Sequence, residues 1–429
     1  MVSERARLLA AQGTPPIAAA HFRAQARPYH PELRPDGYLN LGTAEHRLVW
    51  DLLEPVLAGP RAITAEDTHY GMVYGIPELR EQTADLLTRT RSVPFDPQDL
   101  ILVSGASVAL DIAAAVVCDP GDAIIVPAPY YSGFDADLTG RSEARLVQAP
   151  GTPETGFRLS AAAIADAADR AKASGLRPRA LALCSPTNPL GQVHTPRELR
   201  DVLTVAAEHD LDVITDEIYA NGVFGPTPFT GVYGLPDSPL PPERVHTIWG
   251  FAKDFGVSGL KVGVLHTTGE PARTAARELA YFAPVSTDTQ ALLRSLLADR
   301  GWTDAFLAAS RSRLRESCLH LAGLLDGLGI PYAPAEAGFS VWADLRRGLP
   351  RPGFAGEELL WRALIEQARV SVLPGAVFHS PEPGWFRICH PTDPAVVAEA
   401  VKRIGRVLDA TGRGDVTDAA DRDSERGTG

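Results

Sequence analysis

Short apolar runs alternate with amphipathic segments through the middle of the chain. The apolar runs have the length of strands and lie at 100–103, 123–126, 180–184, 213–215, 245–249 and 262–267. The segments around and between them have a helical pattern, at 78–89, 107–117, 160–172 and 196–208. Runs that are apolar throughout are typical of strands buried on both faces of a parallel sheet. The pattern therefore predicts an α/β fold, in which a mostly parallel sheet lies between helices and binds ligands at the carboxyl ends of its strands.

The pattern changes after about residue 282. Helical spacing continues from about 288 to 328, and shorter strands follow at 339–345 and 385–389, with a last helix from 395 to about 409. This mixture predicts a smaller α+β domain.

The N-terminal segment is expected to complete this smaller domain. Prolines punctuate the first forty residues, so we expect an extended arm there, followed by a helical segment at 43–57. The tail lacks apolar anchors and is expected to be disordered. The predicted division is an arm with part of the small domain at 1–60, a large domain at 61–285, a small domain at 286–411 and the tail at 412–429.

Composition narrows the class of protein. The 429 residues carry a net charge of −12, which argues against nucleic acid or an anionic membrane as a general partner. We expect no membrane span, because no stretch approaches roughly 18 uninterrupted apolar residues. The histidines show no metal-ligand spacing, so we expect no metal site. The four cysteines are scattered, which favours free thiols in a reducing, cytoplasmic compartment.

Lys253 is the first candidate for chemistry. It is one of only four lysines, and it lies in the segment 250–256 directly after the predicted strand 245–249. Taken alone, it is most simply a solvated surface lysine. A lysine held in a loop after a buried strand can also form a Schiff base with an aldehyde.

Three further segments carry polar residues that follow predicted strands or lie within one. Asn188 follows the strand 180–184, Asp216 ends an apolar run with Tyr219 three residues later, and Arg387 lies among apolar neighbours. Each has a structural alternative: Asp216 as a helix cap, Tyr219 as a packing residue and Arg387 as half of a salt bridge. Because ligands gather at the carboxyl ends of parallel strands, the combination with Lys253 favours one active site.

Three longer segments carry a resemblance to a known family. They are Gly75-Ile-Pro-Glu-Leu-Arg, the segment 41–48 and the segment 127–135 with its Tyr130-Tyr131 pair. With the positions above, they resemble the fold-type I pyridoxal-phosphate (PLP) enzymes of the aminotransferase class I/II superfamily, over roughly 39–408. Within that superfamily the sequence looks most similar to 1-aminocyclopropane-1-carboxylate synthases. The resemblance implies an aspartate-aminotransferase-like fold with a large PLP-binding domain.

The resemblance also implies roles around the cofactor ring. Lys253 matches the Schiff-base lysine, and Asp216 matches the carboxylate that holds the pyridine nitrogen protonated. Asn188 and Tyr219 match the residues that bond the phenolic oxygen. Tyr131, with Tyr130 as the less favoured alternative, matches the aromatic residue that stacks on the ring.

Other matched positions bind the two anionic groups. Ser107 and Val108 open a helix that would hold the phosphate, together with Lys261. Arg387 matches the arginine that binds the substrate α-carboxylate. Tyr70 matches a tyrosine that reaches the phosphate of a neighbouring subunit, which implies a homodimer with shared active sites.

Two of these positions depart from the family. Gly250 stands where the family usually has a serine, and Lys261 stands where it usually has an arginine; both family residues bind the phosphate. Either the change is compensated drift, or the phosphate cup is altered for an unusual second substrate.

The resemblance implies two reactions that share a start. The substrate amine displaces Lys253, which then removes the α-proton, so that an aldimine becomes a quinonoid. A synthase-like enzyme then expels methylthioadenosine from S-adenosylmethionine (SAM), with cyclisation or addition of a second reactant. An aminotransferase instead passes the amino group to a 2-keto acid. Glu45 matches the synthase motif and favours SAM, because its carboxylate suits a sulfonium cation; its alternative role is a carboxylate at a helix N-terminus.

Two further observations bear on context. Intact Lys253, Asp216 and Arg387 argue against a non-catalytic regulator with this fold. A composition rich in Ala, Arg and Gly, with few lysines, favours a GC-rich bacterium and an enzyme of specialised metabolism.

Overall fold

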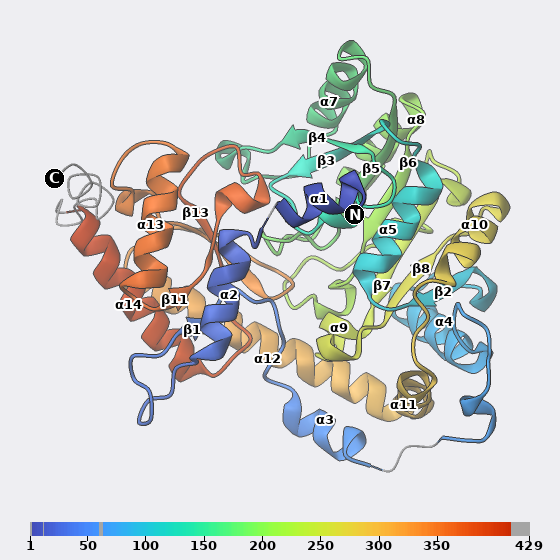
Figure 1. Cartoon of the computed structure of the whole chain (residues 1–429), viewed down its shortest axis with the longest axis horizontal. Helices are drawn as coiled ribbons and strands as arrows, with labels where there is room; N and C mark the ends of the chain where they lie inside the picture. The colour runs from blue at the N-terminus through green and yellow to red at the C-terminus, as the bar shows by residue number, and fades with distance from the viewer. Residues whose placement is uncertain (1, 12, 60–62, 413–429) are drawn as a thin grey trace.

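A central sheet of seven strands forms the larger part of the computed structural model, which describes residues 2–11, 13–59 and 63–412 (Figure 1). Its strand order is β2-β8-β7-β6-β5-β3-β4. Of these seven strands, β8 runs in the opposite direction to the other six. The bounds are β2 Leu100–Val103, β3 Ala123–Ala128, β4 Arg145–Pro150, β5 Pro178–Cys184, β6 Asp212–Asp216, β7 Val245–Gly250 and β8 Gly263–His266. This arrangement confirms the predicted mostly parallel sheet.

Helices cover both faces of this sheet, as the apolar runs predict. In β5, Ala180 and Ala182 face one core and Leu181 and Leu183 face another, because side chains alternate along a strand. The first core contains residues of α5 (Ala106–Val117) and α10 (Glu270–Ala280). The opposite face packs against α7 (Ala161–Ala173) and α8 (Pro196–Glu208), and farther along against α4 (Pro77–Arg91), α11 (Thr287–Ala298) and α12 (Arg300–Gly327).

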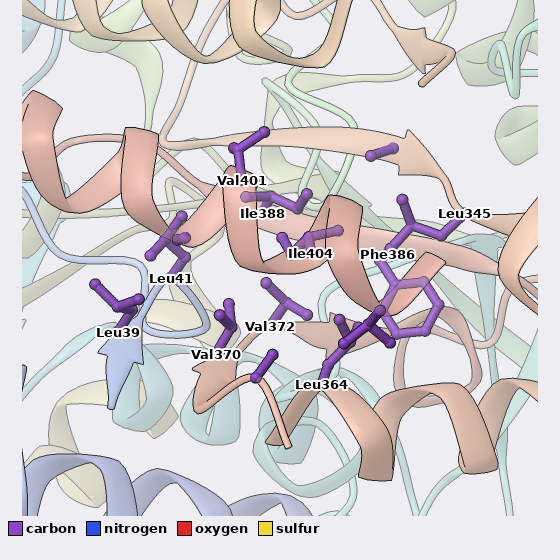
Figure 2. Packing of buried hydrophobic residues seen from close by; sticks show 14 of the residues in the cluster. Leu39, Leu41, Leu345, Leu364, Val370, Val372, Phe386, Ile388, Val401 and Ile404 are labelled. Atoms are coloured by element: carbon purple, nitrogen blue, oxygen red, sulfur yellow. The ribbon is translucent and has the colours of Figure 1, made fainter. Parts of the chain in front are cut away.

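The smaller part combines both ends of the described chain. A four-stranded sheet has the order β12-β13-β10-β9, and β1 pairs in parallel with β11. Leu39 and Leu41 pack with Val370, Ile388 and Val401 in one apolar core (Figure 2). The elements are β1 Leu39–Asn40, β9 Tyr332–Ala333, β10 Ser340–Asp344, β11 Val370–Ser371, β12 Leu373–Pro374, β13 Trp385–Cys389, α13 Phe354–Glu366 and α14 Pro394–Gly412. The predicted domain boundaries themselves remain a prediction.

The N-terminal segment differs from the expected extended arm. It forms two short helices, α1 (Glu4–Ala11) and α2 (Pro16–Ala26), and α2 buries Ala20 and Ala24 against the smaller core. Pro16 does not prevent this helix, because it occupies the first turn, where a missing N–H costs nothing.

Two other predictions are corrected or fall outside the structure. The helix expected over 43–57 is wrong in its first half, since α3 spans Trp50–Leu57. Gly412 is the last residue of α14, and the rest of the tail predicted to be disordered, 413–429, lies outside the described residues. Across the described ranges, no helix is both long enough and apolar enough to cross a bilayer.

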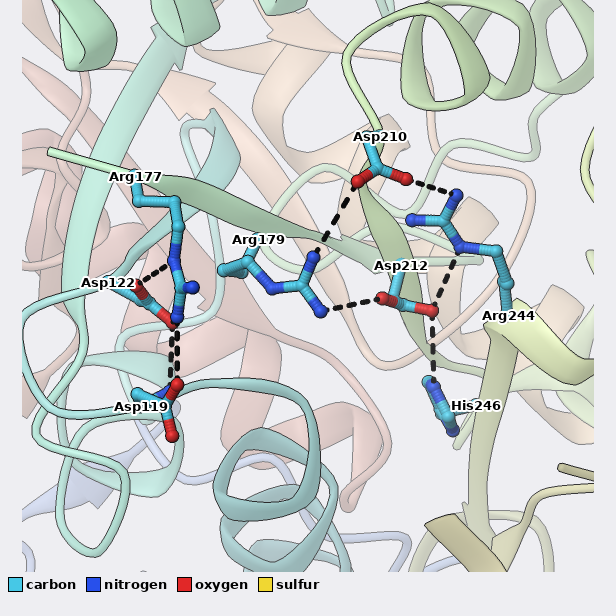
Figure 3. Close-up of polar contacts among 8 residues, drawn as sticks. All are labelled: Asp119, Asp122, Arg177, Arg179, Asp210, Asp212, Arg244 and His246. Carbon is cyan, nitrogen blue, oxygen red and sulfur yellow. Dashed lines mark hydrogen bonds and ion pairs between the residues drawn. The ribbon is translucent and has the colours of Figure 1, made fainter. Parts of the chain in front are cut away.

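Charged pairs join the amino-terminal ends of the large sheet's strands (Figure 3). Before β3, Asp122 accepts a hydrogen bond from Arg177 Nε at 2.7 Å, and Arg177 Nη2 bonds Asp119 at 2.8 Å. At β6, Asp212 accepts from Arg244 Nε at 3.2 Å. These ion pairs lie at the edge opposite Asp216, the last residue of β6, so the carboxyl edge is left for the site described next.

Candidate active site

A cavity of about 940 Å³ lies at the carboxyl ends of β5, β6 and β7. Its wall includes residues from the segment before α3, the start of α5, and β13 of the smaller sheet. All the predicted site residues line it except Val108 and Tyr70. Those that line it are Glu45, Ser107, Tyr131, Asn188, Asp216, Tyr219, Lys253, Lys261 and Arg387.

Lys253 lies in the short helix α9 (Phe251–Asp254), directly after β7. Its Nζ donates a hydrogen bond to the carbonyl oxygen of Ala44 at 2.6 Å. The pKa of the Lys253 amine is lowered from 10.5 to about 8. Burial is the largest cause, and the nearby charge of Arg387 is the second. A large fraction of this amine is therefore neutral, and nucleophilic, at a mildly alkaline pH.

Asp216 ends β6 and is buried. Its Oδ1 accepts a hydrogen bond from the backbone N–H of Ile218 at 3.2 Å. Burial raises the pKa of this carboxyl to about 7, and the charge of Asp137 adds to the rise, while Lys253 opposes it. A buried carboxyl of this kind gains stability when a cationic ligand group faces it.

Arg387 is held by acceptors from two distant segments. Its Nη1 donates to Asn188 Oδ1 at 3.1 Å, and its Nη2 donates to the carbonyl oxygen of Gly42 at 2.5 Å. The guanidinium lies over the ring of Phe378, 5.0 Å from its centre. Within the described chain, no oxygen accepts from the buried Arg387 Nε. Arg387 lines the cavity, so the site has a fixed guanidinium with N–H groups left over for an anionic ligand.

Two tyrosines line the cavity with their rings packed edge-on against phenylalanines. Tyr219 packs on Phe339 with ring centres 5.2 Å apart, and Tyr131 packs on Phe134 with ring centres 5.6 Å apart. Burial raises the pKa of both phenols, so both are neutral hydrogen-bond donors.

Tyr130 contacts Asp135 and His379 instead of lining the cavity. Its hydroxyl donates to Asp135 Oδ1 at 2.8 Å, and its ring stacks on His379 with centres 4.7 Å apart. Tyr131 lines the cavity and Tyr130 does not, which favours Tyr131 over Tyr130 as the ring-stacking residue.

The start of α5 forms one end of the cavity with Lys261. A Cβ added to Gly105, just before the helix, would lie 3.2 Å from Lys261 Nζ, so the ammonium reaches the helix N-terminus. Backbone N–H groups at the start of a helix bind anions such as phosphate. The positive φ of 107° at Gly105 suits a residue without a side chain.

Gly250 has a packing reason to be glycine. It pairs with Gly263 of β8, and an added Cβ would lie 2.7 Å from the carbonyl oxygen of Val262. That distance is too short for a real contact with backbone, so a serine here requires β8 to move. The close approach of β7 and β8 therefore accounts for a glycine rather than a serine at this position.

Glu45 lines the cavity in an ion pair. Its Oε2 accepts hydrogen bonds from Arg47 Nη2 at 2.8 Å and Nε at 3.2 Å, and both side chains are partly exposed. Glu45 directly follows Ala44, whose carbonyl binds Lys253, and its charge acts to raise the pKa of Lys253, but its carboxylate already has a cationic partner.

Val108 and Tyr70 lie outside the cavity. Val108 is in the first turn of α5 and packs against the core of the large sheet. The side chain of Tyr70 is fully exposed in the single chain.

The structure adds cavity residues that sequence reasoning missed. His379 hydrogen-bonds Asp135 Oδ2 at 2.7 Å and Gln148 Nε2 at 2.8 Å, and His21 bonds Thr43 Oγ1 at 2.9 Å. No sequence signal singles out the two histidines. The acidic pair Asp135 and Asp137 follows the tyrosine pair after three intervening residues, and that spacing was the signal available for Asp137.

These residues fit PLP on observations of the structure itself. The helix N-terminus with Lys261 suits a phosphate, and buried Asp216 suits a protonated pyridine nitrogen. The amine of Lys253, with its pKa of about 8, suits an aldehyde. The fixed guanidinium of Arg387 on the cavity wall suits a substrate carboxylate.

Comparison with known proteins agrees with this fit. Residues 39–404 match the family described as Aminotransferase class I and II. The chain is 35% identical over 394 residues to a 1-aminocyclopropane-1-carboxylate synthase of Glycine max, covering 88% of this chain and 81% of the relative. It is 34% identical over 395 residues to 1-aminocyclopropane-1-carboxylate synthase 6 of Arabidopsis thaliana, covering 89% and 80%.

Solved structures of aminotransferases superpose on this chain. A double mutant of aspartate aminotransferase from Thermus thermophilus superposes with a TM-score of 0.76 at 25% identity, covering 95% of this chain and 99% of that one. N-Succinyldiaminopimelate aminotransferase from Mycobacterium tuberculosis gives 0.75 at 25% identity, covering 95% and 100%. The chain therefore belongs to the aminotransferase class I and II family and is a PLP-dependent enzyme of fold type I.

Proposed function

We propose that this enzyme acts on SAM, removing its α-proton and expelling methylthioadenosine from Cγ. The observation that carries the proposal is Glu45, a carboxylate on the cavity wall next to the residue whose carbonyl binds Lys253. A negative charge at that position attracts a sulfonium cation. The relatives named as 1-aminocyclopropane-1-carboxylate synthases support the same chemistry.

PLP supplies an electron sink that stabilises negative charge at the substrate Cα. We assign the attachment of the cofactor to Lys253, and the support of its pyridine nitrogen to Asp216. Asn188 and Tyr219 would bind the phenolic oxygen, and Tyr131 would lie against the ring. Ser107, with Lys261 and the first N–H groups of α5, including that of Val108, would hold the phosphate.

Arg387 would bind the α-carboxylate of the substrate through its free donor. A substrate held at one end has its Cα placed beside the amine of Lys253, which takes the α-proton as a general base. The pKa of about 8 suits this role, because burial leaves a large fraction of the amine unprotonated at a mildly alkaline pH.

The leaving group needs no acid. When the Cγ–S bond breaks, its electron pair stays on the sulfonium sulfur, which becomes the neutral thioether of methylthioadenosine. No proton has to reach that sulfur, so the chain needs only a base at Cα and a carboxylate that favours the cation on binding. Cyclisation, or addition of a second small-molecule reactant, completes the reaction.

The second candidate is an aminotransferase that passes the amino group to a 2-keto acid. The similarity to solved aminotransferases favours it. The same Lys253, Asp216 and Arg387 serve that reaction, and Glu45 then has only its ion pair with Arg47.

We further propose a cytoplasmic homodimer whose subunits share their active sites. The full exposure of Tyr70 supports this, because an aromatic side chain without contacts in its own chain is available to a partner. Four free cysteines support a reducing compartment, and the composition supports a bacterial enzyme of specialised metabolism.

The deciding experiment supplies the PLP-loaded enzyme with SAM and measures methylthioadenosine. The SAM proposal expects its release, with or without a second reactant. The aminotransferase reading expects no response to SAM, and instead release of keto acid from ordinary amino acids with the cofactor left in its pyridoxamine form.

A further inference from the structure

A carboxyl group lies at the phosphate end of the cavity. Asp137 is the last residue of the short helix α6 (Phe134–Asp137), and it lines the cavity with Ser107 and Lys261. The side chain of Ser107 acts on the Asp137 carboxyl and favours its charged form, which lowers its pKa. The Oδ2 of Asp137 is buried and accepts no hydrogen bond from any described residue. Asp137 thus lines the cavity while one of its oxygens is buried without a partner, and a buried polar atom without a partner calls for an explanation.

The phosphate end of the cavity has few positive charges to offset a negative charge on Asp137. Three positively charged side chains line the cavity in its described wall, and Lys261 is the one at this end; Lys253 and Arg387 serve the amine and carboxylate ends. Two further acids act on this end: Asp111, on the next turn of α5, and Asp216. Asp111 is itself paired with Arg141 at 2.7 Å.

The remaining neighbours do not offset a negative charge on Asp137. Tyr131 has a raised pKa, to which Asp137 contributes, and is therefore neutral. Burial raises the pKa of Asp137, with a contribution from Asp111, while Ser107 and Lys261 oppose the rise. A phosphate monoester adds a charge of about −1.5 to −2 at this end at neutral pH. One lysine cannot balance both an ionised carboxyl and that phosphate.

We propose that Asp137 is a phosphate-binding residue of the cofactor site that works in its protonated form. As the phosphate enters, the carboxyl takes one proton from solvent. The neutral acid then has an O–H donor for its otherwise unpaired oxygen, and it presents no negative charge to the phosphate. This inference concerns the cofactor alone and does not depend on whether SAM is the substrate.

The consequence is a pH-dependent affinity for the cofactor. Where the free enzyme has Asp137 ionised, binding takes up a proton, so the Kd for PLP rises by about tenfold per pH unit from this group. An amide at this position carries no charge at any pH and keeps an N–H donor. Asp137→Asn therefore removes this part of the pH dependence and leaves the titrations of PLP and Lys253 in place.

The test is the Kd of PLP for the apoenzyme, measured by absorbance from pH 6 to 9 for wild type and Asp137→Asn. The expected ratio of wild-type to variant Kd grows with pH, toward about tenfold per unit. Pyridoxal, which lacks the phosphate, is the matched ligand and should show no growing ratio. Asp135→Asn removes a charge from the same short helix and the same cavity, and should leave the ratio flat.

Three outcomes would overturn the proposal. The first is a ratio that does not change with pH, and the second is a pH-dependent ratio equally large for pyridoxal. The third is an equal effect of Asp135→Asn, which would show a general effect of cavity charge. Asp137→Ser, with a smaller neutral side chain, provides the same comparison if the asparagine variant does not fold.

Discussion

The guanidinium of Arg387 hydrogen-bonds the side-chain oxygen of Asn188 at 3.1 Å, which joins a strand of the smaller sheet to the loop after β5 of the larger sheet. A second bond, to the carbonyl oxygen of Gly42, adds the N-terminal segment to the same group. Segments separated by more than 140 residues therefore meet at one cation. The planar fork is fixed before any ligand arrives, so little ordering remains to be done on binding.

Arg387 should govern affinity for the substrate carboxylate. Removal of a charge-assisted pair costs about 2–4 kcal/mol, so Arg387→Ala should raise KM by roughly 30- to 1000-fold for amino acids with an α-carboxylate. Steady-state kinetics with SAM measures this, and the visible absorption of bound PLP should not change. Arg387→Lys keeps the charge but loses the fork, and should give an intermediate KM. An unchanged KM in both variants would place the carboxylate elsewhere.

Lys253 should be the most reactive lysine of the apoenzyme near pH 8. Burial lowers its pKa to about 8, so about half of its amine is neutral at that pH. An ordinary lysine with a pKa of about 10.4 is less than about 1% neutral there. Brief acylation followed by peptide mapping should modify Lys253 before the exposed Lys402, with a rate that rises through about pH 8. Pre-incubation with PLP and borohydride should block this reaction, and equal rates at the two lysines would contradict the assignment.

Much of the larger half follows from sequence because its strands are apolar throughout. The runs at 100–103 and 245–249 correspond to β2 and β7, and helix α8 begins and ends as expected. The edge strand β4 was missed, because its side chains are largely exposed and lack that pattern. Helices α10 and α13 were missed as well, and the buried face of α10 consists of alanines such as Ala276 and Ala280, a weak apolar signal.

The site residues that could be predicted from sequence are those that the order of the strands brings together. Asn188, Asp216 and Lys253 follow adjacent strands, so the sheet itself brings them together. His379 was not predictable in this way, because its contact with Asp135 joins the short helix α6 to a distant segment before β13, and their approach depends on the packing of both sheets. Close backbone approach is likewise invisible in sequence, and it explains Gly250.

The two departures in the phosphate cup should behave differently when reversed. Lys261→Arg restores a bidentate donor in a space that already holds a long cation, so it should slow the loss of PLP on dialysis. Gly250→Ser should instead destabilise the protein, because its Cβ meets the carbonyl oxygen of Val262 at 2.7 Å. Overpacking of this kind costs about 1–3 kcal/mol.

Thermal unfolding of the apoenzyme separates these effects, since it contains no cofactor. A lower Tm for Gly250→Ser alone is expected. Tight PLP binding with an unchanged Tm in Gly250→Ser would show that β8 yields readily and that the glycine is simple drift. Lys261→Gln, which removes the charge, is the control for the arginine variant and should lose PLP faster than wild type.

Glu45 should matter for a cationic substrate and not for a neutral one. Two unit charges about 4 Å apart interact by about 1 kcal/mol in bulk water and about 4 kcal/mol near a protein surface, so Glu45→Gln should lower kcat/KM for SAM by at least about fivefold. Arg47→Ala is the matched control, because it removes the partner that bonds Glu45 at 2.8 Å and leaves the carboxylate in place. Since a partly exposed ion pair contributes about 0–1 kcal/mol, this variant should fold normally and bind SAM as well as wild type or better. Methionine has the same α-carboxylate but a neutral sulfur, so its Kd, measured from the cofactor spectrum, should not respond to Glu45→Gln. Equal losses for SAM and methionine would assign Glu45 to the architecture of the 42–45 segment rather than to the sulfonium.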